Sequence, residues 1–157
     1  MDTDRTTDRR DTLLATARRW SESPPPDVVV ELHNLVQAYA LFADNGRADE
    51  LADLFSADAT WDGTELGYGT AEGPEAIAAT VLAHFDPTRP MIHVSGPPLL
   101  VAVAESEVRG VGWCLATRAS SDGAAPLIYF HYDDEFRRDA RGWRFSRRTL
   151  LLRIRAG

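Results

Sequence analysis

Histidines are the residues of this chain that are best suited to acid–base chemistry, because an imidazole gains and loses a proton near neutral pH. The 157-residue sequence contains four of them. His93 lies in a segment where strand alternation puts it on one face with Ser95 and puts Ile92 and Val94 on the other. This pattern is consistent with a polar pocket beside His93. It does not distinguish such a pocket from an ordinary strand histidine that forms hydrogen bonds in the core or at the surface.

A second histidine, His131, lies in an aromatic segment near the C-terminus. Strand alternation places it on one face with Tyr129 and Asp133, opposite Phe130 and Tyr132. Aromatic rings beside a histidine can form a pocket wall with a polar tip, and they can equally be ordinary sheet packing. The sequence leaves both interpretations open.

Asp44 is a carboxylate in an unusual position, the last turn of a predicted helix over residues 28–44, where the helix dipole favours cations. It is either a solvated residue beside the Asn45-Gly46 turn or a functional group. His33 lies close to the same helix face but nearly three turns away from Asp44. We therefore interpret His33 as a surface or interface histidine.

Arginines alternate with aromatic residues in the last predicted strand, around residues 142–150. The simplest interpretation is an amphipathic sheet face whose arginines are solvated or paired with acidic residues. An arginine that turned inward would instead supply a fixed positive charge for an anionic substrate or leaving group.

Three helices, with a short strand between the second and the third, and four longer strands after them are predicted to position these residues. Hydrophobic periodicity and turn residues predict helices over 28–44, 47–55 and 74–85, the first capped by Asp27 and the third opened by Pro74. Strands are predicted over 60–61, 91–103, 107–118, 126–138 and 142–155, with a loop over 62–73. Helices followed by hairpin-connected strands are typical of an α+β fold, in which a curled antiparallel sheet leaves a pocket against the helices.

The segment before residue 27 is predicted to be an N-terminal arm, and residues 27–157 a single domain. The first ten residues are charged and are expected to be disordered. A short helix over 11–20, with Asp11 as its N-cap, carries an apolar stripe that could dock on the body or on another subunit. Three prolines at 24–26 end the arm.

Composition excludes several classes of function. The formal charge is −7, and all seventeen basic residues are arginines, so lysine chemistry is excluded and binding to nucleic acid is not expected. Cys114 is the single cysteine, so no disulfide within the chain and no cysteine-built zinc site can form. The N-terminus resembles no signal peptide, and no apolar run is long enough for a membrane helix. We expect a cytoplasmic protein, and the arginine usage suggests a bacterial source.

Several short motifs, in their order and spacing, resemble the SnoaL-like branch of the nuclear transport factor 2-like superfamily over residues 28–155. They are Tyr39-Ala40-x-x-Ala43-Asp44-x-Gly46-x-x-Asp49, Leu51-x-x-Leu54-Phe55-x-x-Asp58-Ala59, Gly73-Pro74-Glu75-Ala76-Ile77, His93-Val94-Ser95, Tyr132-x-Asp134-x-Phe136 and Gly142-Trp143-Arg144-Phe145-x-x-Arg148. The resemblance implies a cone-shaped α+β barrel, in which a curved mixed or antiparallel sheet wraps three N-terminal helices, often as a homodimer.

One enzyme subset of that superfamily, which includes scytalone dehydratase and a dehydrochlorinase, uses an Asp–His dyad. The resemblance places its aspartate at Asp44, its histidine at His93, its late-strand arginine at Arg148 and a second pocket histidine near His131. Two departures stand out: Tyr39 occupies the position of the dehydrochlorinase lysine, and Ala43 replaces the tyrosine that precedes the dehydratase aspartate.

These observations lead to one main functional hypothesis and two alternatives. The main hypothesis is a lyase or isomerase that uses Asp44 and His93 as an acid–base dyad on a small cyclic or aromatic molecule, without cofactor or metal. Its candidate pocket residues are Tyr39, Trp61, Trp113, Tyr129, His131 and Arg148. The first alternative is a noncatalytic ligand-binding or dimerisation module. The second is a polyketide cyclase-like enzyme with a strand aspartate, Asp133 or Asp134, as its base.

Overall fold

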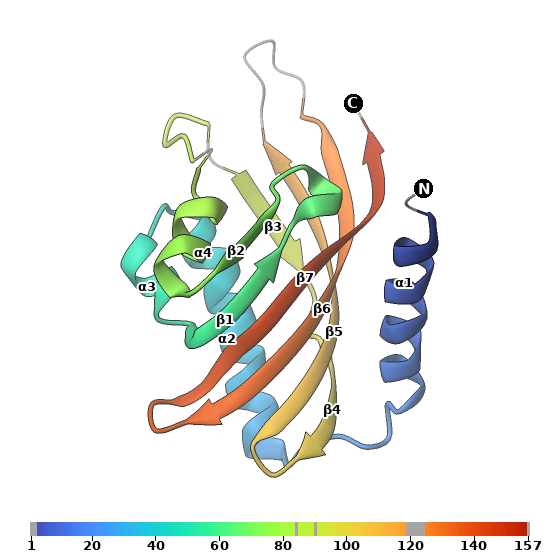
Figure 1. The fold of residues 1–157 in the computed structure, drawn as a ribbon. Coiled ribbons are helices and arrows are strands. Elements are labelled where there is room, and N and C mark those ends of the chain that lie inside the picture. Colours follow the sequence, from blue (N-terminus) through green and yellow to red (C-terminus); the bar gives the residue numbers. More distant parts are fainter. Residues whose placement is uncertain (1–2, 84, 90, 119–124, 157) are drawn as a thin grey trace.

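The computed structural model describes residues 3–83, 85–89, 91–118 and 125–156. Within these ranges the chain forms four α-helices, one short 3₁₀ helix and a sheet of seven strands (Figure 1). The helices are α1 (Thr3–Arg18), α2 (Pro26–Asp44), α3 (Ala48–Ala52), η1 (Thr64–Leu66) and α4 (Pro74–Val81). The strands are β1 (Phe55–Asp62), β2 (Thr70–Glu72), β3 (Met91–Ser95), β4 (Leu99–Ala104), β5 (Glu107–Arg118), β6 (Leu127–Asp139) and β7 (Gly142–Ala156).

The sheet is mixed, curved and not closed into a barrel. Its strands follow the order β2-β1-β7-β6-β5-β3, and β4 also pairs with β5. The β1–β7 pairing is parallel and the other pairings are antiparallel. Figure 1 shows α2, α3 and α4 on one side of the sheet and α1 on the other. This arrangement confirms the predicted α+β class, with a curved sheet that wraps three helices.

The two faces of the long strands have different surroundings. Residues that pair directly across antiparallel strands share a face. His93 pairs with Ala116, and this inner face meets the helices and contains the main core. Trp113 pairs with His131, and this outer face faces away from α2. The outer face carries exposed apolar side chains such as Ile92, which is 53% exposed.

Helix α1 is longer than the sequence predicts. It begins at Thr3, so residues 3–10 are helical rather than disordered, and Asp11 lies inside the helix instead of capping it. The helix packs against β4 and β5, and its Leu13 side chain is buried. Arg9 forms an ion pair with Asp62 at 2.8 Å. The docking explains the order, because buried apolar surface offsets the entropy that ordering a charged segment costs.

Other element boundaries also differ from the predictions. Helix α2 begins at Pro26 with Pro25 as its N-cap, so Asp27 lies in the first turn, and α4 ends at Val81. Strand β1 covers eight residues instead of two. Its pairing with β7 is irregular and the middle of the strand is exposed, so its sequence lacks the regular alternation that predicts a strand. The segment predicted as a loop contains η1 and β2, and the predicted strand 91–103 divides into β3 and β4. In the described part of the chain, no helix is long and apolar enough to cross a membrane.

Candidate functional site

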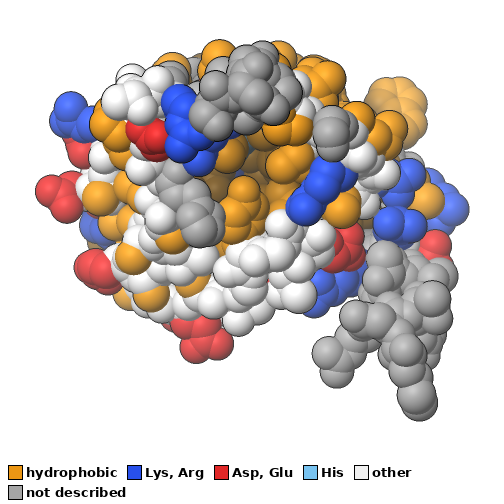
Figure 2. Space-filling view, turned by 90° about the horizontal axis from the view of Figure 1, so that it is seen from above, with side chains coloured by type: hydrophobic (Ala, Val, Ile, Leu, Met, Phe, Trp, Pro, Cys, Tyr) orange, Lys and Arg blue, Asp and Glu red, His pale blue; other side chains and the backbone are white. Residues whose placement is uncertain are grey.

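A cavity opens between the inner face of the sheet and the helices. The space open to the centre of a water molecule is about 50 Å³, and the total atom-free space, including solvent at the open mouth, is about 650 Å³. Figure 2 shows it as a hollow lined mainly by hydrophobic side chains, with basic side chains near its rim. Much of the wall is aliphatic, from Leu66, Val81, Leu82, Met91, Ile128 and Leu150. Its polar lining comes from His93, Arg118 and three tyrosines, Tyr39, Tyr68 and Tyr132.

Asp44 and His93 are in direct contact at the cavity wall. Asp44 Oδ1 lies 2.5 Å from His93 Nδ1, and Asp44 Oδ2 accepts a hydrogen bond from the His93 backbone N–H at 3.0 Å. The two side chains are only 19% and 13% exposed, respectively. A carboxylate has no proton to donate, so the Nδ1–H must donate to Asp44. The neutral ring therefore has an unprotonated Nε2.

Local structure explains how the two residues meet. Asp44 is the last residue of α2, and the chain turns there because Gly46 adopts the left-handed conformation at φ 65°. Ring atoms of Phe85, a cavity-lining residue, lie within 2.8 Å of the place where a Cβ on Gly46 would sit. His93 is the middle residue of β3, whose alternation turns it inward. The end of α2 thus lies directly against β3.

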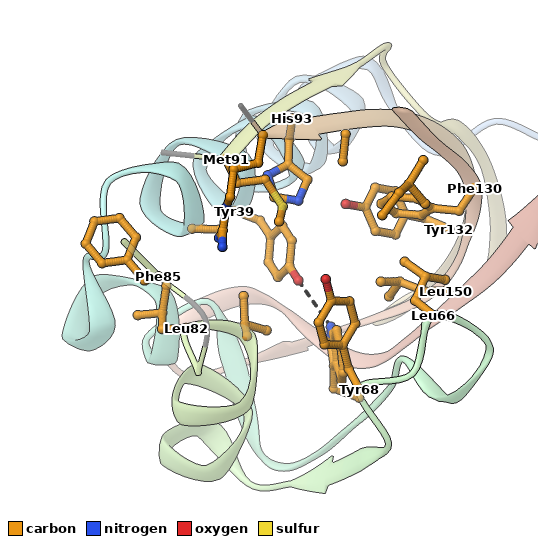
Figure 3. A pocket seen from close by; sticks show the side chains of 16 residues that line it. Tyr39, Leu66, Tyr68, Leu82, Phe85, Met91, His93, Phe130, Tyr132 and Leu150 are labelled. Carbon is orange, nitrogen blue, oxygen red and sulfur yellow. Dashed lines mark hydrogen bonds between the residues drawn. The ribbon is translucent and has the colours of Figure 1, made fainter. Parts of the chain in front are cut away.

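The free side of the His93 ring faces the interior of the cavity. Figure 3 shows the imidazole and the hydroxyl groups of Tyr39, Tyr68 and Tyr132 directed toward the same space. Among the described residues, none forms a hydrogen bond with Nε2 of His93. A molecule in the cavity would therefore meet an unprotonated ring nitrogen and several hydroxyl groups.

Tyr39 is positioned by a buried hydrogen bond. Its hydroxyl oxygen accepts from Trp61 Nε1 at 3.1 Å, which leaves the hydroxyl proton free to be donated (Figure 3). Burial raises the pKa of Tyr39 above its usual value, and the charge of Arg148 offsets part of that rise. Burial also raises the pKa of Tyr132 well above its usual value. Both tyrosines therefore stay protonated near neutral pH and can act as hydrogen-bond donors.

A buried ion pair supports these aromatic side chains from below. Arg148 donates to both carboxylate oxygens of Asp134, at 2.9 and 2.8 Å, and both residues are completely buried. The guanidinium carbon lies 4.2 Å from the ring centroid of Tyr39 and 3.8 Å from that of Tyr132. Such cation–π stacking fixes the two rings that carry the donor hydroxyls. Because Asp134 neutralises it, Arg148 is a structural group and not a free charge for a ligand.

Comparisons with known proteins agree with this architecture. Residues 28–149 match the SnoaL-like domain. This chain belongs to the SnoaL-like family. No curated protein matches it in sequence.

Solved structures show the same fold at low sequence identity. A hexachlorocyclohexane dehydrochlorinase, LinA-type3, from Novosphingobium barchaimii is 23% identical, with a TM-score of 0.68 over 80% of this chain and 86% of its own. Two proteins from Novosphingobium aromaticivorans are each 20% identical. One, provisionally assigned as a scytalone dehydratase, has a TM-score of 0.68 over 94% of this chain and 90% of its own. The other, provisionally assigned as an aromatic ring hydroxylase, has a TM-score of 0.74 over 84% and 93%.

The candidate pocket residues of this SnoaL-like chain divide into three groups. Tyr39 and Trp61 line the cavity together with His93. Arg148 lies beneath the lining, held by Asp134. The remaining three, Trp113, Tyr129 and His131, do not line the cavity.

Trp113, Tyr129 and His131 lie on the outer face of the sheet, which corrects the predicted wall. Trp113 is 43% exposed and pairs with His131, whose Nε2 lies 3.2 Å from the Tyr129 hydroxyl. Burial, and then the charges of Arg153 and Arg10, lower the pKa of His131. Strand alternation correctly predicts which residues of β6 share a face, but the aromatic face that turns inward is the one with Phe130 and Tyr132.

Neither strand aspartate is available as a base in the cavity. Both oxygens of Asp134 are engaged by Arg148. Asp133 belongs to the outer face, where Arg147 Nη2 lies 3.3 Å from its Oδ2. The geometry therefore favours His93 over an aspartate as the base. Among the described residues, no group of three or more His, Cys, Asp or Glu side chains could hold a metal ion.

Sequence reasoning missed Arg118 and the tyrosines Tyr68 and Tyr132 as lining residues. Strand alternation carries the signal for two of them. Cys114 is fully buried, so Ala116 and Arg118 point inward on the same face of β5. Tyr132 shares its face with Phe130 in the same way. Tyr68 lies between η1 and β2, where no periodic pattern exists to indicate its direction.

Cys114 should be inert to thiol reagents in the folded protein. It is fully buried, and burial raises the pKa of its thiol to about 11. Near pH 8 roughly one molecule in a thousand would carry the reactive thiolate. We expect iodoacetamide to leave the folded protein unmodified and to add one group in urea, as measured by intact mass. Modification of both states at equal rates would contradict the burial.

Proposed function

We propose that this protein is a cofactor-independent lyase or isomerase that removes a proton from a small cyclic or aromatic molecule. The observation that carries the proposal is the contact between Asp44 and His93 at the wall of the cavity. The carboxylate accepts the Nδ1–H, and it stabilises the imidazolium that forms when Nε2 takes a proton from carbon. His93 is thus the base, and Asp44 is the residue that orients its ring and stabilises its charged form.

The tyrosine hydroxyls supply the complementary acid. Tyr39 and Tyr132 stay protonated because burial raises their pKa values. A hydroxyl donor stabilises the oxygen that gains charge when a proton leaves the carbon next to a carbonyl. In an elimination, the electron pair of the broken C–H bond forms the double bond and the leaving group departs with its own pair. In an isomerisation, the imidazolium returns the proton to another carbon.

The cavity wall and the structural neighbours support this type of substrate. Aliphatic and aromatic side chains form most of the lining, which suits a ring with few polar groups. The neighbours of this fold include a hexachlorocyclohexane dehydrochlorinase and a protein provisionally assigned as a scytalone dehydratase. The first name denotes an elimination from a cyclic molecule and the second a loss of water, and both support an elimination as the reaction proposed for this cavity.

Deuterium exchange tests the proposal without knowledge of the natural substrate. The wild-type protein is incubated in D₂O near neutral pH with cyclohexanone, 1-indanone and 1-tetralone, and the loss of α-proton signals is followed by NMR. We expect exchange of at least one ketone above the uncatalysed rate, and a decrease of about 100-fold or more in His93→Ala. For 3-hydroxycyclohexanone, loss of water to cyclohexenone is monitored in parallel.

His131→Ala is the matched control, because it removes an imidazole from the outer face and leaves the cavity unchanged. It should retain wild-type exchange within about twofold. Ketones that raise the melting temperature but show no exchange would favour the noncatalytic ligand-binding alternative. Exchange that survives His93→Ala would show that another group is the base.

A further inference from the structure

Arg118 is a cation in the cavity wall with no acidic partner among the described residues. It is the last residue of β5, pairs with Met91 across the sheet, and lines the cavity with His93. Its Nε is shielded from solvent and has no hydrogen-bond partner in the described part of the chain. The side chain as a whole is partly exposed, and Arg144 Nε and Arg148 Nη1 also lack a partner, so Arg118 stands out through its place in the cavity wall, where an unpartnered charged donor favours binding of an anionic group.

The surroundings of Arg118 contain no carboxylate that could neutralise it. None of the described residues that line the cavity is Asp or Glu. Asp44, the acid next to the wall, is engaged through both oxygens by His93. Arg148, the other inward arginine, differs in charge balance, because it forms an ion pair with Asp134, although its Nη1 also has no hydrogen-bond partner in the described part of the chain. The positive charge of Arg118 is thus the feature of the lining that remains unmatched.

Strand geometry places Arg118 close to the proposed base. His93 pairs with Ala116, so Arg118 is its diagonal neighbour on the same face of β3 and β5. Such diagonal neighbours lie about 7 Å apart in antiparallel sheets. Both side chains therefore extend from neighbouring positions on the same face into the same cavity, where one small molecule can contact both.

From these observations we infer that Arg118 is a specificity-determining residue that binds the carboxylate of a small cyclic acid in the cavity. The planar guanidinium matches a carboxylate in shape and charge and can donate two parallel hydrogen bonds. A single guanidinium balances the one negative charge of a carboxylate, whereas a phosphate monoester dianion would need a second cation. The inference deepens the proposed function, on which it rests in treating the cavity as a substrate site.

Binding of matched acid and amide pairs tests the inference independently of turnover. The probes are benzoate, cyclohexanecarboxylate and 2-naphthoate, each compared with its primary amide by calorimetry near neutral pH. We expect at least one acid to bind wild-type protein about tenfold more tightly than its amide. In Arg118→Gln the preference should fall below about twofold while binding of the amide is unchanged.

Two further variants separate Arg118 from general charge effects and from the base. Arg138→Gln removes an exposed arginine on β6 and should keep the full preference for the acid. His93→Ala should also keep it, although this variant abolishes proton exchange if the proposed function is correct. A preference that persists in Arg118→Gln, or a panel with no preference in wild type, overturns the inference. Absence of exchange together with an Arg118-dependent preference would overturn only the proposed function.

Discussion

Replacing Arg148 by Met should destabilise the fold by about 3–5 kcal/mol, because the substitution leaves the Asp134 carboxylate buried without a partner. The same change removes the cation that stacks on Tyr39 and Tyr132. The free energy of unfolding is obtained from urea denaturation of the variant and the wild type. A decrease in the free energy of unfolding of less than about 1 kcal/mol would show that the ion pair contributes little to the stability of the fold.

The destabilisation by Arg148→Met should depend on pH in a defined direction. Burial already raises the pKa of Asp134, and the Arg148 charge is what opposes that rise. Without Arg148 the pKa rises further, so the folded state binds a proton that the unfolded state releases. The variant should therefore lose stability as the pH increases from the ordinary aspartate range toward neutral. The double variant Arg148→Met/Asp134→Leu, which buries no charge, should recover much of the loss and remove this dependence.

Replacing Asp44 by Asn should reduce proton exchange by about 100-fold or more. The neutral amide cannot stabilise the imidazolium. Because an amide offers both a donor and an acceptor, it also no longer holds the neutral His93 ring in the Nδ1–H tautomer. The rate is measured by NMR with a ketone that the wild type exchanges. Asp58→Asn is the control, because this exposed carboxylate pairs with Arg137 far from the cavity and should change the rate by less than about twofold.

The double variant Asp44→Asn/His93→Ala tests whether the two residues act as a unit. If they do, removing both should reduce the rate no further than His93→Ala alone. Losses that multiply would mean that Asp44 and His93 contribute independently, and the dyad assignment would then be wrong.

Local sequence patterns predict the positions of Asp44 and His93 but not their contact. Asn45-Gly46 marks the end of α2, and alternation with Ile92 and Val94 sets the direction of His93. The two residues are 49 positions apart, so only the tertiary arrangement brings them together. The resemblance to SnoaL-like proteins was the sole indication of this pair in the sequence.

Strand alternation identifies which residues share a face but not which face turns inward. In β6 both faces are aromatic, so Tyr129 and His131 fitted a pocket wall as well as Phe130 and Tyr132 did. The choice depends on how the sheet curves around α2, which no local pattern encodes.

The pairing of Arg148 with Asp134 could not be predicted from the sequence either, because it depends on an irregularity in the register of β6 and β7. The β6–β7 hairpin begins with Asp139 opposite Gly142, and simple counting from there would pair Asp134 with Arg147. A one-residue shift between Glu135 and Phe136 instead places Asp134 opposite Arg148. The bulge therefore directs Arg148 inward and Arg147 to the outer face.

The central claim is that Asp44 holds the neutral His93 ring with its proton on Nδ1 and with a bare Nε2 facing the cavity. Long-range ¹H–¹⁵N NMR of the histidine side chains, assigned with His93→Ala, measures this tautomer directly on the neutral ring. We predict a protonated Nδ1 and an unprotonated Nε2 in the wild type, and a mixture of tautomers in Asp44→Asn. A wild-type His93 that carries its proton on Nε2 would contradict the account.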